Sequence, residues 1–292
     1  MPGLNPLKII GNLKFMAAGL KLPTSASWRQ PSGDPAAAHY GEALQPHERV
    51  ALPRLTPPWF TPQNRHKYHQ QSCDDIGEEF KKLHDGMIDA VQFAHNMWRF
   101  QAKFQNLKVM ALSAIGTPGC LDGPSLQSGI KTAPSCAAFT GNRAKYRDAV
   151  AKGVSTAFKS WQDNVMVPGL PWYPAFVAFP GPQAPPMPNV PTPLIACTSS
   201  RLSDITAPDT MKREMIGALD SELKDSDPDK QHEALFDAIA TVLALAFLMW
   251  LPMQQVMLVL GKGPIPTFAP PLVPAGPVVS GDNIAVSGHL MV

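Results

Sequence analysis

Residues 166–197 read MVPGLPWYPAFVAFPGPQAPPMPNVPTPLIAC, and ten of these thirty-two positions are proline. Because proline lacks a backbone donor, neither a helix nor a central strand is expected to run through this segment. A polyproline II-like path would expose the apolar side chains between the prolines. We therefore expect the segment to lie on a surface, either of its own chain or of a neighbouring subunit.

Two further blocks have the same style. ALPRLTPPWFTPQ occupies 51–63, and GKGPIPTFAPPLVPAGPVV occupies 261–279. The 32 prolines are roughly twice the usual share, but 45% of the residues are hydrophobic, which a disordered chain would lack. The apolar anchors in the three blocks are predicted to bind partner subunits: Trp59, Phe60, Trp172, Tyr173, Phe176, Phe179, Phe268, Leu272 and Val273.

Between these blocks, apolar residues recur every three or four positions, which predicts helices. A short amphipathic helix is expected before Pro23, and a hairpin is expected near the C-terminus, with Val278–Val279 facing 284–286 across a turn. Four long helices are predicted. The first two run from Ser72 to about Leu112 and from Asn142 to Val165. The third begins at Thr206 with Pro208 in its first turn, and the fourth runs from Asp227 to Leu260 with a kink at Pro252.

These elements predict a mainly α protein. A helical bundle of about four long helices would be wrapped by proline-rich extended arms, with a short C-terminal β-hairpin. The expected divisions are an extended basic arm (1–70), a helical hairpin (71–165), a proline-rich extended segment (166–205), a helical pair with an apolar central helix (206–261) and a proline-rich extended tail (262–292).

The charge balance gives no case for nucleic-acid binding, since the formal net charge is +2. The first thirty residues do carry four basic residues and no carboxylate: Lys8, Lys14, Lys21 and Arg29. Two interpretations stay open, a solvated terminal arm and a basic arm for an acidic partner or membrane. Prolines and lysines interrupt the apolar start, so no signal peptide is predicted, and we expect a cytoplasmic protein or a component of a virion-like particle.

The four cysteines have no CxxC spacing, and no metal site or cofactor is predicted from them. Cys120 and Cys136 bracket a loop and could close it as a disulfide, although buried free thiols are the favoured state. Neither a GxSxG elbow nor a P-loop is present, so no catalytic residues and no enzyme activity are predicted. The apolar run 238–253 is interpreted as a buried core helix, with a membrane-inserting helix as the alternative.

The blocks VPGLPWYPAF, PPMPNVPTPL and GKGPIPTFAPPLVPAGPVV resemble segments of structural proteins from tailed phages and related contractile injection particles. That resemblance implies a subunit of a baseplate, tube, sheath accessory or shell. The expected function is therefore structural: an assembly subunit that binds neighbouring protein subunits, as a homo- or hetero-oligomer, through its proline-rich apolar arms. A membrane-docked protein that uses helix 238–253 is the alternative function.

Overall fold

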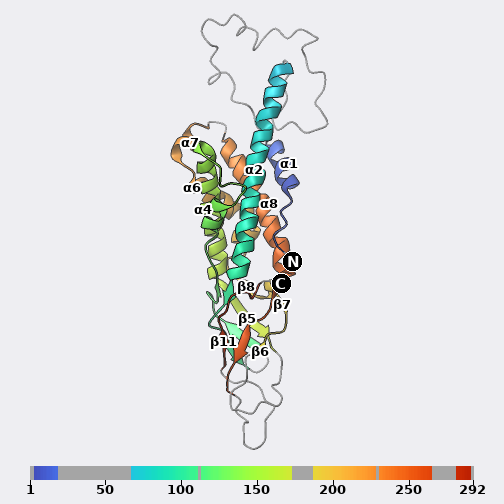
Figure 1. The fold of residues 1–292 in the computed structure, drawn as a ribbon, viewed down its shortest axis with the longest axis vertical. Coiled ribbons are helices and arrows are strands. Elements are labelled where there is room, and N and C mark those ends of the chain that lie inside the picture. Colours follow the sequence, from blue (N-terminus) through green and yellow to red (C-terminus); the bar gives the residue numbers. More distant parts are fainter. Residues whose placement is uncertain are drawn as a thin grey trace, which may run out of the picture.

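The computed structural model describes residues 3–18, 67–110, 113–172, 187–227, 230–264 and 281–290. Helices lie above a β-sheet (Figure 1). The two ends of the chain lie close together, near the junction between the helices and the sheet. The helices are α1 (Lys8–Ala17), α2 (Lys67–Gln101), α3 (Leu126–Thr132), α4 (Gly141–Asp163), α5 (Ser203–Thr206), α6 (Pro208–Ala218), α7 (Ser221–Asp225) and α8 (Gln231–Met253), with a 3₁₀ turn, η3 (Leu194–Ala196).

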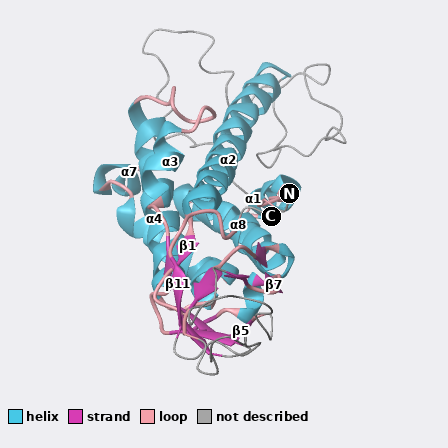
Figure 2. Ribbon diagram, turned by 60° about the horizontal axis from the view of Figure 1, so that its bottom comes forward, coloured by secondary structure: helices cyan, strands magenta, loops and turns pink. Residues whose placement is uncertain are grey.

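The strands are short and come from most of the chain. They are β1 (Lys103–Phe104), β2 (Lys108–Met110), β3 (Ser113–Gly116), β4 (Leu121–Asp122), β5 (Val165–Pro171), β6 (Met187–Pro188), β7 (Thr192–Pro193), β8 (Thr198–Ser199), β9 (Gln255–Val256), β10 (Leu260–Lys262) and β11 (Gly281–Ile284). Figure 2 shows most of them gathered at one end of the helices.

The three long helices α2, α4 and α8 run in the same direction, toward the sheet (Figure 1). A shorter antiparallel helix fills each groove between two of them: α1 between α2 and α8, α3 between α2 and α4, and α6 between α4 and α8. Helices α4 and α6 approach closely, and a Cβ on Gly153 would lie 2.5 Å from the Met215 side chain and 2.6 Å from its backbone nitrogen. Glycine at this position lets the two backbones touch.

Helix α2 follows the predicted apolar stripe but ends eleven residues early. Met87, Val91, Ala94 and Trp98 are buried at spacings of three and four. The 35 residues span about 52 Å, somewhat less than the sequence predicted. The expected extension to Leu112 is wrong, because the chain leaves the helix after Gln101 and continues as β1 and β2, with Asn106 between them at a left-handed φ of 57°.

The predicted fold class is also wrong. Seven strands form one curled antiparallel half-barrel sheet in the order β6-β10-β11-β2-β3-β5-β8, and β1-β4 and β7-β9 form two further pairs. The molecule therefore combines helices with a substantial sheet, in place of a helical bundle with one short hairpin. Residues 113–141, expected to be a loop connection, contribute β3, β4 and α3.

Strand β5 corrects the expectation that no central strand can pass through the proline-rich stretch. It lies between β3 and β8, inside the sheet. Its register against β3 shifts between the pairs Ala114↔Leu170 and Gly116↔Val167. This bulge accommodates Pro168 and Gly169, which do not have to join the regular ladder there. Pro188 and Pro193 belong to the short strands β6 and β7, each of which pairs on one side only.

The C-terminal half mixes confirmed and corrected predictions. Helix α4 matches the predicted second helix, and α6 begins with Pro208 as its first residue, as expected. The last helix ends at Met253, one residue after Pro252, and does not continue to Leu260. Strand β11 pairs with β10 and β2, and Ile284 lies opposite Leu260. The predicted hairpin, in which Ile284 would pair within the C-terminal segment, is therefore wrong at this residue. Val278 and Val279 lie outside the described residues.

One continuous apolar core extends from Leu4 to Leu290. Its densest part, the aromatic cluster, lies where the last turns of α2, α4 and α8 converge. Trp98 and Trp250 give their indole N–H groups to Gln162 and Gln254 at 2.8 and 3.1 Å, so these large side chains are buried without an unpaired donor. The cluster consists of His95, Trp98, Phe158, Trp161, Phe247 and Trp250.

Candidate functional site

The partner-binding residues predicted from the sequence fall almost entirely outside the described residues. Trp172 is the exception, and it is only 3% exposed. Its indole N–H donates to the Met187 carbonyl at 3.1 Å, and its ring covers Gly261. Trp172 is therefore an anchor within its own chain. Outside the described residues lie Trp59, Phe60, Tyr173, Phe176, Phe179, Phe268, Leu272 and Val273.

Cys120 and Cys136 are buried free thiols with different partners, so they do not form the disulfide that the sequence allowed. The Cys120 thiol donates to the Val165 carbonyl, and the Cys136 thiol to the Gly86 carbonyl. Burial raises the pKa of Cys120 to about 11, and it raises the pKa of Cys197 to about 12. These two thiols stay protonated at neutral pH and are poor nucleophiles.

The basic N-terminal residues inside the described region are used by the chain itself. Helix α1 is docked, and its Lys8 and Lys14 pair with Asp89 on α2 and Asp237 on α8, each at 2.6 Å. These two ion pairs link α1 to α2 and α8, the long helices on either side of it. They are not free to attract an acidic partner, while Lys21 and Arg29 lie outside the described residues.

Helix α8 is long and apolar enough to cross a membrane, by length and composition alone. In the structure, 67% of its most apolar window is buried. Most of its apolar surface therefore packs inside the fold, as expected for a core helix, and we do not propose membrane docking.

Four histidines of the described part of the chain are buried, but they do not form a reactive group. His232 contacts Asp227 at 2.7 Å, and His84 contacts Asp85 at 2.9 Å. His95 is enclosed by aromatic rings, and burial, with Arg99 nearby, holds its pKa well below the usual value. No group of three or more potential metal ligands occurs among the described residues.

One face of the sheet is unusual for its composition. In β2, β3 and β5 the inward side chains are fully buried, as expected for a sheet that covers a core. The outward side chains are also mostly apolar, where solvent-facing antiparallel sheets usually carry polar residues. We call this set the outer apolar face: Met110, Ile115, Met166, Pro168 and Pro171.

The strand registers set these side chains on neighbouring strands, with Ser113 between Met110 and Pro171 and Lys108 opposite Ile115. Met110 pairs with Ser113, which in turn pairs with Pro171. Ile115 lies between the pairs that Ala114 and Gly116 make with β5, and therefore beside the Pro168 bulge. Exposures of 52% for Met110, 45% for Ile115 and 38% for Met166 show that no described residue covers them. The ion pair of Lys108 with Asp282 marks the polar border of the face.

A second exposed stripe lies on α2. Phe93, Met97 and Phe100 follow one another at helical spacing and are 40–47% exposed. They are on the opposite side of α2 from the buried stripe that ends at Trp98. The stripe is narrower than the outer apolar face, and solvent reaches it along the helix.

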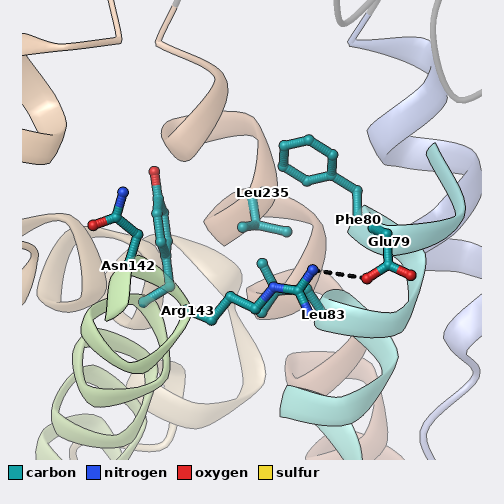
Figure 3. A pocket seen from close by; sticks show the side chains of 7 residues that line it. Glu79, Phe80, Leu83, Asn142, Arg143 and Leu235 are labelled. Atoms are coloured by element: carbon teal, nitrogen blue, oxygen red, sulfur yellow. Dashed lines mark hydrogen bonds and ion pairs between the residues drawn. The ribbon is translucent and has the colours of Figure 1, made fainter. Parts of the chain in front are cut away.

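The structure also has an open pocket of about 490 Å³ at the upper end of the long helices, which we call the helix pocket. Phe80 and Leu83 of α2, Tyr146 of α4 and Leu235 of α8 form its apolar part. Figure 3 shows Arg143 reaching from α4 to Glu79 on α2 across this space, with Asn142 beside it. Phe80 lies beside Glu79 and Leu83 lies beside Arg143, so polar and apolar groups are neighbours around the pocket.

Sequence reasoning did not find either site. Glu79, Arg143 and Tyr146 were not among the predicted site residues. The outer apolar face was missed because 166–171 was interpreted as an arm. The available signal was the short apolar run Val165–Met166–Val167, whose β-branched residues are typical of a strand.

Comparisons with known proteins add no assignment. Neither a protein-family model, nor a curated protein, nor a solved structure matches the chain.

Proposed function

We propose that the protein is a structural subunit that assembles with further copies of itself through the outer apolar face. The observation that carries this proposal is the sheet whose two faces are both apolar. One face covers the core, and the other presents Met110, Ile115 and Met166 to solvent on adjacent strands. Contiguous exposed apolar side chains are typical of protein interfaces.

The geometry of the face favours a protein partner. Its five side chains stand on hydrogen-bonded strands, so they have little freedom to move relative to one another. Burying such a surface stabilises a complex by roughly 25 cal/mol per Å² of apolar area, and rigid side chains lose little entropy on binding. A polar border, such as Lys108 with Asp282, is usual around an apolar interface core.

The charge of the chain does not oppose self-association. A net charge of +2 on 292 residues produces weak repulsion between copies. The resemblance of the proline-rich blocks to structural proteins of phage tails and contractile injection particles supports the same class of function. In that setting the sheet face would be one of several contacts that each subunit makes.

Light scattering coupled to size exclusion tests the proposal on the full chain between about 1 and 100 µM, the range in which weak subunit contacts form. We expect wild type to form a defined oligomer. Met166→Lys and Ile115→Lys should reduce it to monomer, because each places a charge in the centre of the contact. Thr156→Lys is the matched control, since Thr156 is exposed on α4 and adds the same charge elsewhere.

The Thr156→Lys variant should keep the wild-type mass, and thermal unfolding should show that all the variants are folded. A wild-type monomer at every concentration contradicts the proposal. So does an oligomer that survives both lysine substitutions in the sheet, because the contact would then lie elsewhere.

A further inference from the structure

The helix pocket has properties that self-association does not use. Three helices contribute to it, and its volume of about 490 Å³ is in the range of small-molecule sites, about 300–1,000 Å³. Phe80, Leu83 and Leu235 supply apolar walls, while the polar groups lie at Glu79 and along the start of α4. A ligand that fills it needs an apolar body and a polar end.

The polar groups of the helix pocket include more hydrogen-bond donors than free acceptors. Glu79 provides the carboxylate, and its two oxygens already accept from Lys82 and Arg143, each at 2.7 Å. These cations hold the pKa of Glu79 below its ordinary value, Lys82 being the larger influence. One carboxylate therefore accepts from two cations, with Glu78 also near Lys82 and Asp227 near Tyr146, so Glu79 has little capacity left for a cationic ligand.

The start of α4 adds further donors to the same side. The first turn of α4 has no acidic residue, and its N-cap, Thr140, makes no side-chain capping hydrogen bond. The first backbone N–H groups of a helix have no partner within the helix, and the helix dipole is positive there. The described residues also offer no hydrogen-bond partner to the side chains of Asn142 or Tyr146. The unused capacity at this end of the pocket thus consists mainly of donors.

We propose that the helix pocket binds a small amphiphilic carboxylate, a molecule with a compact aliphatic or aromatic body and one carboxylate. The body would lie against Phe80, Leu83 and Leu235. The carboxylate would accept hydrogen bonds from Arg143 and Asn142 at the start of α4. A carboxylate is matched by one guanidinium in a bidentate pair, whereas a phosphate group would call for more positive charge than this largely apolar pocket supplies.

Isothermal titration of the full-length protein with octanoate tests this assignment, with octanamide as the neutral ligand of the same shape. We expect octanoate to bind and octanamide to bind at least tenfold more weakly. Arg143→Gln should weaken octanoate at least tenfold. Lys159→Gln is its matched control, because Lys159 is also an exposed, paired cation of α4 but lies near the other end of the helix.

Two further variants separate the pocket from non-specific adsorption. Leu235→Trp fills the apolar part and should abolish octanoate binding, with thermal unfolding as the check that the variant is folded. Glu79→Gln releases Arg143 from its ion pair and should tighten octanoate binding several-fold. That gain of affinity cannot come from misfolding, so the assignment can be tested even where Leu235→Trp is unstable.

The assignment is overturned if octanoate does not bind wild type at millimolar concentration, or if the amide binds equally well. Equal binding to wild type and Arg143→Gln also overturns it. The result is independent of the proposed assembly, because the pocket residues lie on helices and the outer apolar face lies on β2, β3 and β5.

Discussion

The three long helices α2, α4 and α8 enclose two very different interiors at their two ends. Near the sheet, each helix contributes a tryptophan, and Trp98, Trp161 and Trp250 are at most 1% exposed. At the upper end the same helices contribute Glu79, Arg143 and Leu235, and a pocket of about 490 Å³ stays open between them. The same three helices therefore border a filled core at one end and an open pocket at the other.

The two ends also treat polar groups differently. In the aromatic cluster, Gln162 and Gln254 pair with indole N–H groups, but neither ring nitrogen of His95 has a partner among the described residues. At the upper end, polar groups reach solvent, so their unpaired donors carry no burial cost. Polar groups without a hydrogen-bond partner therefore destabilise the aromatic cluster near the sheet. At the upper end of the helices, such groups can bind a ligand.

The largest expected effect separates the two ends by stability. Trp250→Ala should cost about 3–5 kcal/mol, because it leaves a cavity in a close-packed cluster and removes the indole N–H that donates to the Gln254 side-chain oxygen. Leu235→Ala should cost about 2 kcal/mol, at the low end for a leucine, since its side chain already borders an open space. Urea unfolding of both variants measures the difference, and equal losses would show that the pocket is closed in solution.

A smaller effect should appear on acidification, again at the sheet end. The ring of His289 accepts a hydrogen bond from the Phe104 amide at 2.8 Å, and burial lowers its pKa from 6.5 to about 4. Above pH 6.5 the histidine is neutral in both states. Between pH 6.5 and 4 only the unfolded chain takes up the proton, so stability falls as the pH falls, by up to about 3 kcal/mol.

The variant His289→Asn isolates this contribution, because an amide oxygen can replace the ring nitrogen as acceptor but does not titrate. Urea midpoints measured from pH 7.5 to 4.5 should fall less steeply in the variant than in wild type. Buried His95 adds to the wild-type slope in the same direction, since its pKa is also lowered. An unchanged slope in His289→Asn would mean that His289 does not stay neutral in the folded protein.

The smallest expected effect is a gain. His95→Phe keeps an aromatic ring 4.4 Å from the Trp250 ring and removes two buried nitrogens that have no hydrogen-bond partner. Because an unsatisfied buried polar group costs about 1–3 kcal/mol, the variant should be more stable by about 1 kcal/mol after some loss of fit. Thermal unfolding measures it, and a destabilised His95→Phe would show that the imidazole has a polar partner in solution.

Local sequence patterns predicted the elements that local forces decide. Helix α4 and the start of α6 at Pro208 follow from apolar spacing and from the fixed φ of proline. The end of α2 was harder, because Phe104 and Leu107 continue the helical spacing although the helix ends at Gln101 and Phe104 belongs to β1. The position of β5 was also mispredicted, because proline is usually absent from interior strands except at bulges, and Pro168 lies at a bulge.

The sheet and the helix pocket could not be predicted in this way because they join residues far apart in sequence. Lys108 on β2 contacts Asp282 on β11 across 174 positions, and Arg143 contacts Glu79 across 64. The periodicity of apolar residues within a segment of ten or twenty residues contains no information about such a pairing. The residue types were visible in the sequence, but the place where they meet was not.

The position of β11 has a consequence for how the protein is made. This strand lies between β10 and β2, and Asn283 also pairs with the backbone of Phe104 and Leu107. A ribosome adding about 5–20 residues per second delivers residue 281 some 9–35 s after Val109. During that interval the edge of β2 that will receive β11 has no partner, so a nascent chain can collapse its helices but cannot complete its sheet.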